Sequence, residues 1–420
     1  MSGLLTWQLA LRYLRGKKSA NAVPILSRIS MVAIAVGTGA MIVLFSVFNG
    51  FEALVKDTYK AFYPDIKISP ARGKFFKLDS SQLLHIIQVE GVNSVTNVIE
   101  DNVLAKEDNM GGGANKGNDN QLVLTLKGID KQYFKVNNIH QYLLGTVDSV
   151  SEGQPNTAIA GEQVIKELGV DFNNLFSYIM LYYLDPTVTN PEADPASAFQ
   201  SLRLHPAGAF SVLEEFDSRY ILAPLHLAQN LFHAEGMYSS IEINAQPNDI
   251  PVIKDKLQKL LGNGYVIASR YEQNKTMYLV MNTEKWAVYL ILLLVLLIAS
   301  FNMVGALSML VLEKQKDIAI LKAMGMTPAG IQQVVLLEGV LWSLTGGLAG
   351  LFLGCGICLL QMKFGLVKIN GSFLVDAYPV KIEFTDILVV VATIIVVGVL
   401  ASLYPSLKAT KTIDPSLKGA

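Results

Sequence analysis

The sequence is short of charge and of cysteine. Only 16% of its 420 residues are charged, whereas 51% are hydrophobic, and the mean hydropathy is +0.38. This composition is too apolar for an ordinary soluble protein of this size. The net charge is −1 and no broad basic tract occurs, so nothing indicates nucleic-acid binding. The composition therefore predicts a membrane protein.

The two cysteines, Cys355 and Cys358, both lie inside an apolar run. The large polar middle of the chain must therefore fold by core burial, without disulfides. Although the pair matches CxxC, it lacks the βαβ setting of a redox motif. We interpret both cysteines as small packing residues of a membrane helix.

Catalytic and nucleotide-binding motifs are also missing. The closest match to a phosphate loop, Gly112 to Gly117, is followed by Asn118 and not by Lys and Ser/Thr. No nucleophile elbow or HExxH motif occurs. The five histidines show no metal-ligand spacing: His85, His140, His205, His226 and His233. We expect no catalytic residues, no metal site and no cofactor bound by this chain.

Four long apolar runs predict transmembrane helices, at residues 29–48, 286–312, 334–360 and 387–403. About 20 apolar residues suffice to cross a hydrocarbon core of ~30 Å. Lysine and arginine gather before the first run, between the second and third, and after the last. The positive-inside rule then places both termini in the cytoplasm.

The predicted fold class is an α-helical membrane protein with four transmembrane helices in a 1+3 arrangement. A large α+β domain is inserted outside the cytoplasm between helices 1 and 2. The predicted segments are an interfacial amphipathic helix (1–24), TM1 (25–49), the outer domain on helical stalks (50–284), TM2 (285–312), a cytoplasmic elbow (313–333), TM3 (334–360), a short outer loop (361–386), TM4 (387–404) and a cytoplasmic tail (405–420).

The N-terminal helix is predicted at residues 3–15. Its polar wedge is Gln8, Arg12 and Arg15, and Trp7 lies on the apolar side. This pattern favours a helix in the headgroup region over a soluble amphipathic helix, because a membrane span starts about ten residues later.

The outer region contains two predicted β-α-β units, far apart in sequence. The first comprises residues 65–69, 80–88 and 94–99, and the second comprises residues 239–244, 249–261 and 265–269. Such units can pair into one split α/β sandwich, with the residues between them forming a strand-rich second subdomain.

A long proline-rich loop, Asp185 to Pro206, lies between two predicted strands of this subdomain. Loops of this length are uncommon in compact domains and are usually either functional or disordered. One interpretation is a mobile hairpin tip, and the other is a docking hook for a second protein. The residue pattern leaves both open.

The elbow, residues 313–333, is a charged stretch between two apolar runs. The pattern predicts a short amphipathic helix with Ile318, Leu321 and Met324 on one side. Gly325 would end this helix, and Thr327 with Pro328 would start the next. A structured helix between the ends of two transmembrane helices is well placed to contact a soluble partner and to be moved by it.

The third span has glycine at every fourth position, Gly346, Gly350 and Gly354, which gives a face for close helix packing. A comparable face on the first span is Ala33, Gly37 and Ala40. Packing inside one protomer and contact between two protomers both remain open. Glu338 is costly in a span unless it reaches the interface or a partner, so we expect it near the cytoplasmic boundary.

The elbow, the glycine-rich span and the ending Tyr404 to Gly419 resemble the signature region of FtsX/MacB-type ABC transporter permeases. The stretch Phe216 to Phe232 matches as well, and the likeness covers essentially the whole chain. Within this group, the segments LALRYLRGKK, VFNGFE and YPDIKIS look most similar to the LolC/LolE lipoprotein-releasing subunits.

The resemblance implies a permease that is not itself an enzyme, in the bacterial inner membrane, with a periplasmic outer domain. The implied partners are a LolD-like ATPase that holds ATP and Mg, a second permease subunit, identical or related, a LolA-like periplasmic carrier, and lipoprotein substrates in membrane lipid. Carried over, the coupling role falls on Asp317, Ile318, Ala319, Leu321, Lys322 and Gly325. The hook would carry Pro186, Pro191, Pro195 and Phe199, and the substrate cavity Val43, Val47, Leu290 and Leu294.

Three functions follow as hypotheses from this resemblance. The leading one is extraction of lipoproteins from the inner membrane and transfer to the carrier. The alternatives are MacB-like efflux and an FtsX-like regulator of cell-wall hydrolases that transports nothing. The resemblance leaves open whether the dimer is homomeric or heteromeric, and which of the two Lol permeases the chain acts like.

Overall fold

The computed structural model describes residues 22–109, 120–144, 156–171, 174, 176–184, 199–368 and 377–411. The chain divides into two compact units. A helical unit contains Met1–Leu54, Leu279–Ile369 and Val375–Ala420, and a sheet unit contains Val55–Tyr278 and Asn370–Leu374. The predicted interfacial helix at residues 3–15 and most of the predicted tail lie outside the described residues.

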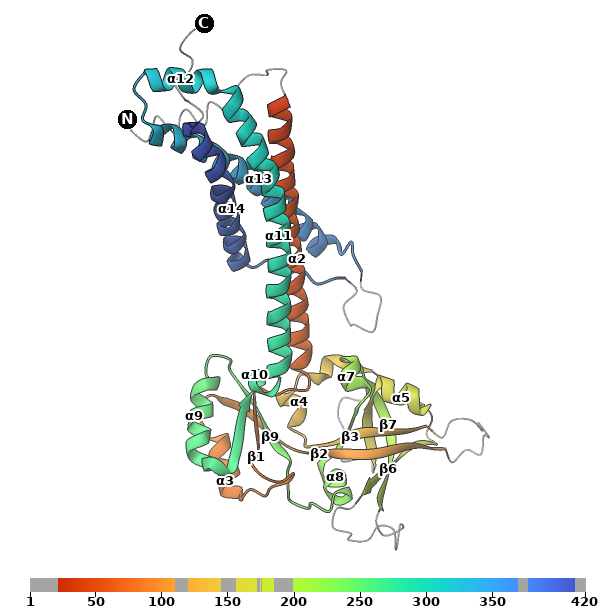
Figure 1. Cartoon of the computed structure of the whole chain (residues 1–420). Coiled ribbons are helices and arrows are strands. Elements are labelled where there is room, and N and C mark those ends of the chain that lie inside the picture. The colour runs from red at the N-terminus through yellow and green to blue at the C-terminus, as the bar shows by residue number, and fades with distance from the viewer. Residues whose placement is uncertain are drawn as a thin grey trace. The chain divides into compact units, whose positions relative to one another are not determined.

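Within the described residues, four helices are long and apolar enough to cross a membrane: α2 (Ala22–Tyr59), α11 (Lys275–Glu313), α13 (Pro328–Phe364) and α14 (Phe384–Lys411). They can be followed in Figure 1. Each contains one of the four predicted apolar runs, so the prediction of four such helices is confirmed. All four exceed the predicted runs because polar residues extend the helices at their ends.

The glycine row of α13 packs against α2 within the same chain. A Cβ added at Gly350 would lie 2.2 Å from the carbonyl oxygen of Ala35, and one at Gly354 would lie 2.9 Å from that of Gly39. Such distances leave no room for any side chain, so glycine permits the close approach. The row is therefore used for packing inside one protomer.

The residues of α2 that meet this row follow the same spacing of four. Gly346, Gly350 and Gly354 meet Met31, Ala35 and Gly39. Of the predicted row, Gly37 instead faces Leu296 of α11, with 3.4 Å between that side chain and an added Cβ. α2 therefore has small residues on two neighbouring faces, and the packing of whole helices decides which helix each face meets.

The sheet unit contains one sheet in the order β10-β1-β9-β2-β3-β8-β5-β7-β4, with β6 paired to β2 and β7. The strands are β1 (Ile66–Pro70), β2 (Val92–Asn109), β3 (Gln121–Ile129), β4 (Leu143–Leu144), β5 (Thr157–Gly161), β6 (Ser177–Leu184), β7 (Phe199–Phe210), β8 (Tyr220–Pro224), β9 (Ser240–Ala245) and β10 (Tyr265–Ser269). The helices are α3 (Ser80–Ile87), α4 (Tyr133–Val136), η1 (Ile139–Tyr142), α5 (Glu162–Leu168), α7 (Glu214–Asp217), α8 (Leu225–Leu231), α9 (Ile250–Leu261), η2 (Gly262–Gly264) and α10 (Arg270–Gln273).

The two predicted β-α-β units pair with each other. Strand β1 lies between β9 and β10, antiparallel to both, with Ile68 opposite Ile241 and Ile267. The helices α3 and α9 contribute Ile86 and Ile253 to the apolar core that these strands share. The prediction that the distant units combine is confirmed, and the strands of the intervening region continue the same sheet.

The predicted hook is shorter than its sequence pattern suggested. Strand β7 begins at Phe199, which lies opposite Leu184 of β6, so the last part of the predicted loop, including Pro206, is strand. Pro206 is tolerated because the register with β5 shifts next to it, between Ala158 and Ile159. Pro186, Pro191 and Pro195 lie outside the described residues.

Charged side chains are buried or half-buried within the sheet unit. Glu242 of β9 accepts hydrogen bonds from Lys127 Nζ at 2.7 Å and from Asn137 Nδ2 at 2.6 Å. Lys67 of β1 lies 2.8 Å from Glu100 of β2. Each of these carboxylates has a cationic partner, which is the condition under which charges are retained inside a protein.

Candidate functional site

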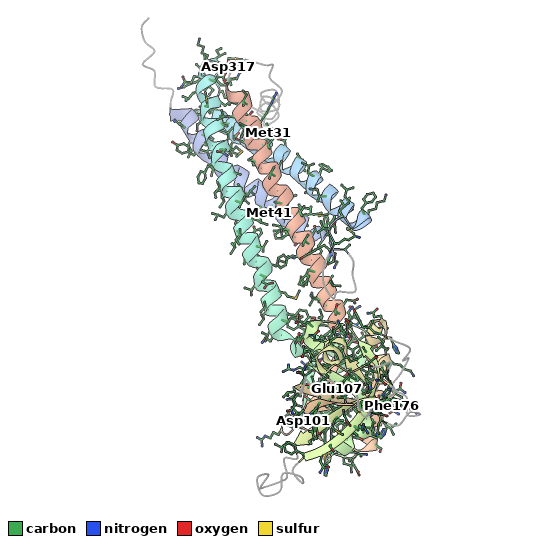
Figure 2. All side chains as sticks on the ribbon, turned by 90° about the vertical axis from the view of Figure 1, so that its right-hand side faces the viewer. Met31, Met41, Asp101, Glu107, Phe176 and Asp317 are labelled. Atoms are coloured by element: carbon green, nitrogen blue, oxygen red, sulfur yellow. The ribbon has the colours of Figure 1, made fainter. Side chains whose placement is uncertain are left out.

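A short helix, α12 (Gln315–Ala323), connects α11 to α13. In Figure 1 it lies across one end of the helical unit, the end at which α2 begins and α14 finishes. In Figure 2, Asp317 of α12 and then Met31 and Met41 of α2 follow one another along the unit from this end. Lys314 is the single residue between α11 and α12, and it is the N-cap of α12.

Both ends of the elbow are fixed by local hydrogen bonds. Gly325 has φ +90°, its N–H donates to Lys322 O at 3.0 Å, and the N–H of Met326 donates to Leu321 O at 3.0 Å. This pair of bonds is the Schellman motif, which requires a left-handed residue. Thr327 Oγ1 then accepts from Gly330 N–H at 3.3 Å. The predicted stop and restart of the helix are confirmed.

The inward side of α12 anchors it to three neighbouring helices. Ile318 is 7% exposed, and Leu321 packs beside it in the same apolar cluster. The other members of this cluster are Val311, Met326, Ile331, Val335 and Ala409. These residues come from α11, the turn, α13 and α14, so α12 packs against all three long helices.

Met324 does not share this side, contrary to the prediction from helical spacing. It is 73% exposed, because its N–H still donates to Ile320 O at 2.9 Å, which keeps it in the last helical turn on the side of Ile320 and away from Ile318 and Leu321. Met326 takes the inward position and packs against Leu321, which is the apolar contact typical of this motif.

The outward side of α12 is apolar at two positions. Ile320 is 59% exposed and stands one helical turn before Met324, so the two side chains fall on the same side. Among the residues predicted to couple, Ala319 and Lys322 are also exposed, whereas Ile318 and Leu321 point inward. The sequence analysis did not include Ile320 among the coupling residues. Its spacing of four from Met324 could have indicated an apolar outward side of the helix.

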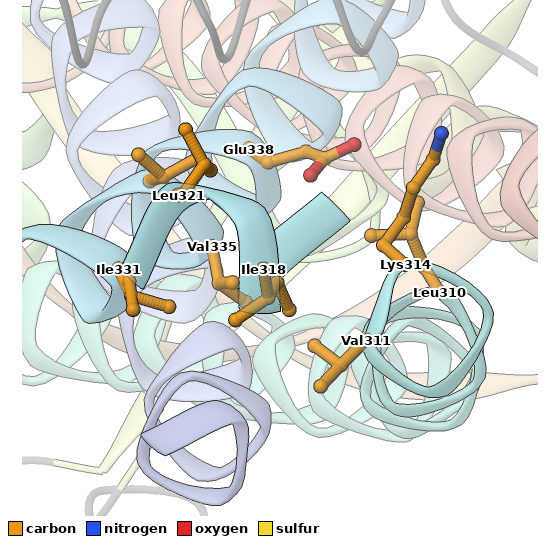
Figure 3. A pocket seen from close by; sticks show the side chains of 9 residues that line it. Leu310, Val311, Lys314, Ile318, Leu321, Ile331, Val335 and Glu338 are labelled. Atoms are coloured by element: carbon orange, nitrogen blue, oxygen red, sulfur yellow. The ribbon is translucent and has the colours of Figure 1, made fainter. Parts of the chain in front are cut away.

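A pocket lies between α12 and the two long helices that it connects, shown in Figure 3. It has about 370 Å³ of empty space, part of it open to solvent. Among the described residues, its walls are apolar except for two charged side chains, Lys314 and Glu338. The apolar lining is Leu310, Val311, Ile318, Leu321, Ile331, Val334 and Val335.

Glu338 is buried at this pocket, with 1% of its surface exposed. Its Oε1 atom has no hydrogen-bond partner among the residues that the structure describes. Lys314 instead lies with its Nζ 3.1 Å from Asp317 Oδ2. Figure 3 shows Glu338 and Lys314 on the same rim of the pocket.

The predicted cavity residues lie on two helices of the same unit. Leu290 and Leu294 are exposed on α11, whereas Val43 and Val47 are partly buried on α2. The substrate cavity stays a prediction. Phe199, the described member of the predicted hook, is exposed at the start of β7.

A polar cluster that the sequence pattern did not suggest joins three of the long helices. Lys285 of α11 lies 2.9 Å from Asn49 Oδ1 of α2 and 3.2 Å from Asp386 Oδ1 of α14. Asn49 also donates to Asp386. The three residues are distant in sequence, so only packing of the helices brings them together.

Comparison with known proteins gives matches to both units. The family model described as a MacB-like periplasmic core domain matches residues 27–259, more than half of the chain, and that of the FtsX-like permease C-terminal domain matches residues 289–412. The periplasmic region of MacB from Actinobacillus actinomycetemcomitans is structurally similar with a TM-score of 0.36 and 13% identity, over 54% of this chain and 98% of that one.

Curated relatives match along nearly the whole length. The lipoprotein-releasing system transmembrane protein LolC of Xylella fastidiosa (strain 9a5c) is 24% identical over 98% of both chains. The LolE protein of Haemophilus influenzae is 25% identical over 95% of both, and the LolC protein of Neisseria meningitidis serogroup B is 24% identical over 98% of both. The chain thus belongs to the family of permeases that combine a MacB-like periplasmic core domain with an FtsX-like permease C-terminal domain.

Proposed function

We propose that this chain is the permease subunit of an ABC transporter that extracts lipoproteins from the inner membrane and passes them to a periplasmic carrier. The observation that carries this proposal is the match, over 95–98% of both chains, to transmembrane proteins of lipoprotein-releasing systems. The match spans the sheet unit and the helical unit together, so it includes the parts that would contact cargo and motor.

In this proposal α2 crosses the membrane before the sheet unit, and α11, α13 and α14 cross after it. The sheet unit is then periplasmic, and α12 faces the cytoplasm together with both termini. The lysines of the elbow and the basic residues before α2 support this orientation, because positive charge favours the cytoplasmic side.

The motor is a separate ATPase subunit that binds ATP and Mg and docks on α12. Ile320 and Met324 form an exposed apolar pair, with Lys316 and Lys322 exposed on the same short helix. Apolar contacts surrounded by charge are typical of a specific protein interface. Ile318 and Leu321 on the other side anchor α12 to the long helices, so the helix can pass on a movement of the motor.

Depletion of the protein tests the transport function. After depletion, lipoproteins of the outer membrane should accumulate in the inner membrane, measured by separating the two membranes and blotting for known lipoproteins. Return of a plasmid copy is the control, and it should restore the distribution. Normal sorting combined with a defect in efflux would support a MacB-like exporter instead. Normal sorting with a division defect would support a regulator of cell-wall hydrolases.

Substitution of the exposed pair tests docking. Ile320→Asp with Met324→Asp should abolish co-purification of the ATPase while the permease still accumulates in the membrane. Ile320→Leu with Met324→Leu is the matched control, because it keeps an apolar surface of similar volume. Leu321→Asp is a poorer test, because Leu321 packs in the cluster that anchors α12. Unchanged co-purification of the aspartate variant contradicts docking on this face.

A further inference from the structure

We propose that Glu338 is an alternative partner of Lys314, so that an exchange of ion pairs links the position of α12 to α13. In the state described here, Lys314 pairs with Asp317. When the motor displaces α12, Lys314 leaves Asp317 and pairs with Glu338. Glu338 is then a positioning residue that acts through Lys314. This inference rests on the proposed docking of an ATPase on α12.

The state of Glu338 is the first observation. An acid with 1% of its surface exposed and one oxygen without a hydrogen bond, among the described residues, is costly unless a partner becomes available. In the described part of the chain, the lining of the pocket into which it faces has one other charged side chain, that of Lys314. The opposite charge needed to satisfy Glu338 is thus present at the same pocket.

The position of Lys314 is the second observation. As the single residue between α11 and α12, it is the point about which α12 turns when it moves relative to α11. Any such turn also reorients its long side chain. Lysine has a flexible stem and three rotatable donors, which suit it to a change of partner.

The pair that must break is an exposed one. The side chains of Lys314 and Asp317 are 40% and 44% exposed, and exposed ion pairs contribute little to stability because water and salt screen them. Asp317 is in the first turn of α12, so a protein that covers this helix changes its surroundings directly. Inside the apolar pocket, by contrast, an ion pair of Lys314 with Glu338 is screened less.

Cysteine crosslinking tests the movement. The two native cysteines, Cys355 and Cys358, are first replaced by serine and alanine, and Lys314→Cys and Glu338→Cys are introduced together in the full transporter. A short bifunctional thiol reagent should join the new cysteines faster with ATP and vanadate than without nucleotide. The cysteine pair at 314 and 317 is the matched control, and its crosslinking should slow under the same conditions. Equal rates with and without nucleotide overturn the exchange.

Measurement of coupling tests the role of the charge. Glu338→Gln should leave ATPase co-purification and ATP turnover within about twofold, and reduce lipoprotein release per ATP by at least about fivefold, the lower end of typical coupling between two sites. Lys314→Gln should give the same loss, and the double variant should lose no more than either single variant, because both remove one pair. A purely structural role for Glu338 would instead lower the thermal stability of the permease and its yield.

The outcomes separate the two proposals. If the unmodified chain binds no ATPase, the docking function fails and the exchange fails with it. Suppose instead that the ATPase binds and is active. The exchange alone is then wrong if Glu338→Gln releases lipoproteins as well as the unmodified chain does. It is also wrong if the fold-losses of release in the two single variants multiply in the double variant.

Discussion

Arg270 and Asp65 join the two places where the chain enters and leaves the sheet unit. One guanidinium nitrogen of Arg270 lies 3.0 Å from Asp65 Oδ1, and Arg270 Nε donates to the carbonyl oxygen of Tyr63 at 2.9 Å. Asp65 Oδ2 also accepts from Ala245 N–H at 3.0 Å. Asp65 follows the end of α2 and Arg270 opens α10, so this pair fixes the two connecting segments to each other.

Loss of Arg270 should loosen this connection. Arg270→Met leaves the buried carboxylate of Asp65 without its cation, and we expect the sheet unit to lose about 3 kcal/mol, the scale seen when one partner of a buried pair is removed. Hydrogen exchange of β1 and β10 in the full chain measures the loss. Lys256→Met is the control, because its partner Glu90 is exposed, and it should change little. Equal effects of the two substitutions would contradict the buried-pair interpretation.

Gly350→Ala should separate α13 from α2. The added Cβ would meet backbone atoms of Ala35 at 2.2 to 2.9 Å, and backbone cannot move aside as a flexible side chain can. Gly356→Ala on the same helix is the matched control, because an added Cβ there has nothing within 4 Å. We expect a lower thermal midpoint in detergent for Gly350→Ala alone. A lowered midpoint in both variants would indicate a general effect of alanine and not the close approach.

Glu242→Gln should destabilise the core of the sheet unit. Burial alone would lower the pKa of Lys127, but Glu242 and other neighbours hold it well above its ordinary value, so the lysine stays charged. Without the Glu242 charge, the carboxylate that remains near Lys127 among the described residues is that of Glu100, 4.0 Å away, and we expect a loss of about 3 to 5 kcal/mol. Chemical denaturation followed by hydrogen exchange of β3 and β9 measures this. Lys166→Met, which removes an exposed pair with Glu162, should stay near zero.

Asp217 should make the sheet unit less stable as pH rises from about 4 to about 6. Burial raises the pKa of Asp217 from 3.8 to about 6, so the folded state binds a proton in this range that the unfolded state has lost. The folded state then loses about 1 to 3 kcal/mol as that proton leaves. Asp217→Asn should remove this slope, measured by hydrogen exchange of β5 and β8 across the range. An unchanged slope in the variant would show that another group titrates.

The pH dependence of stability that Glu100 causes can be distinguished from that of Asp217. Burial alone would raise the pKa of Glu100, but Lys67 and Lys127 hold it at about 2. Its contribution to stability is complete above its ordinary value near 4.5 and is lost only as pH falls towards 2. The effects of the two carboxylates therefore have opposite signs, and their pH ranges overlap only near pH 4.

The sequence by itself determined the features that depend on neighbouring residues. The four apolar helices follow from run length. The limits of α12 follow from Gly325, Thr327 and Pro328, because caps are decided within one turn. The two β-α-β units were also predictable, since alternation and helical periodicity are local patterns.

Only the tertiary structure decided which of several suitable faces is used. The packing of α13 selects Met31, Ala35 and Gly39 over the neighbouring small residues of α2. The turn after α12 buries Met326, whereas Met324 stays exposed on the outward side. Long-range packing also places Glu338 at the same pocket as Lys314, 24 positions earlier in the chain. Spacing along one helix shows which residues share a side, but contact with other helices determines which side is buried and what a buried charge can reach.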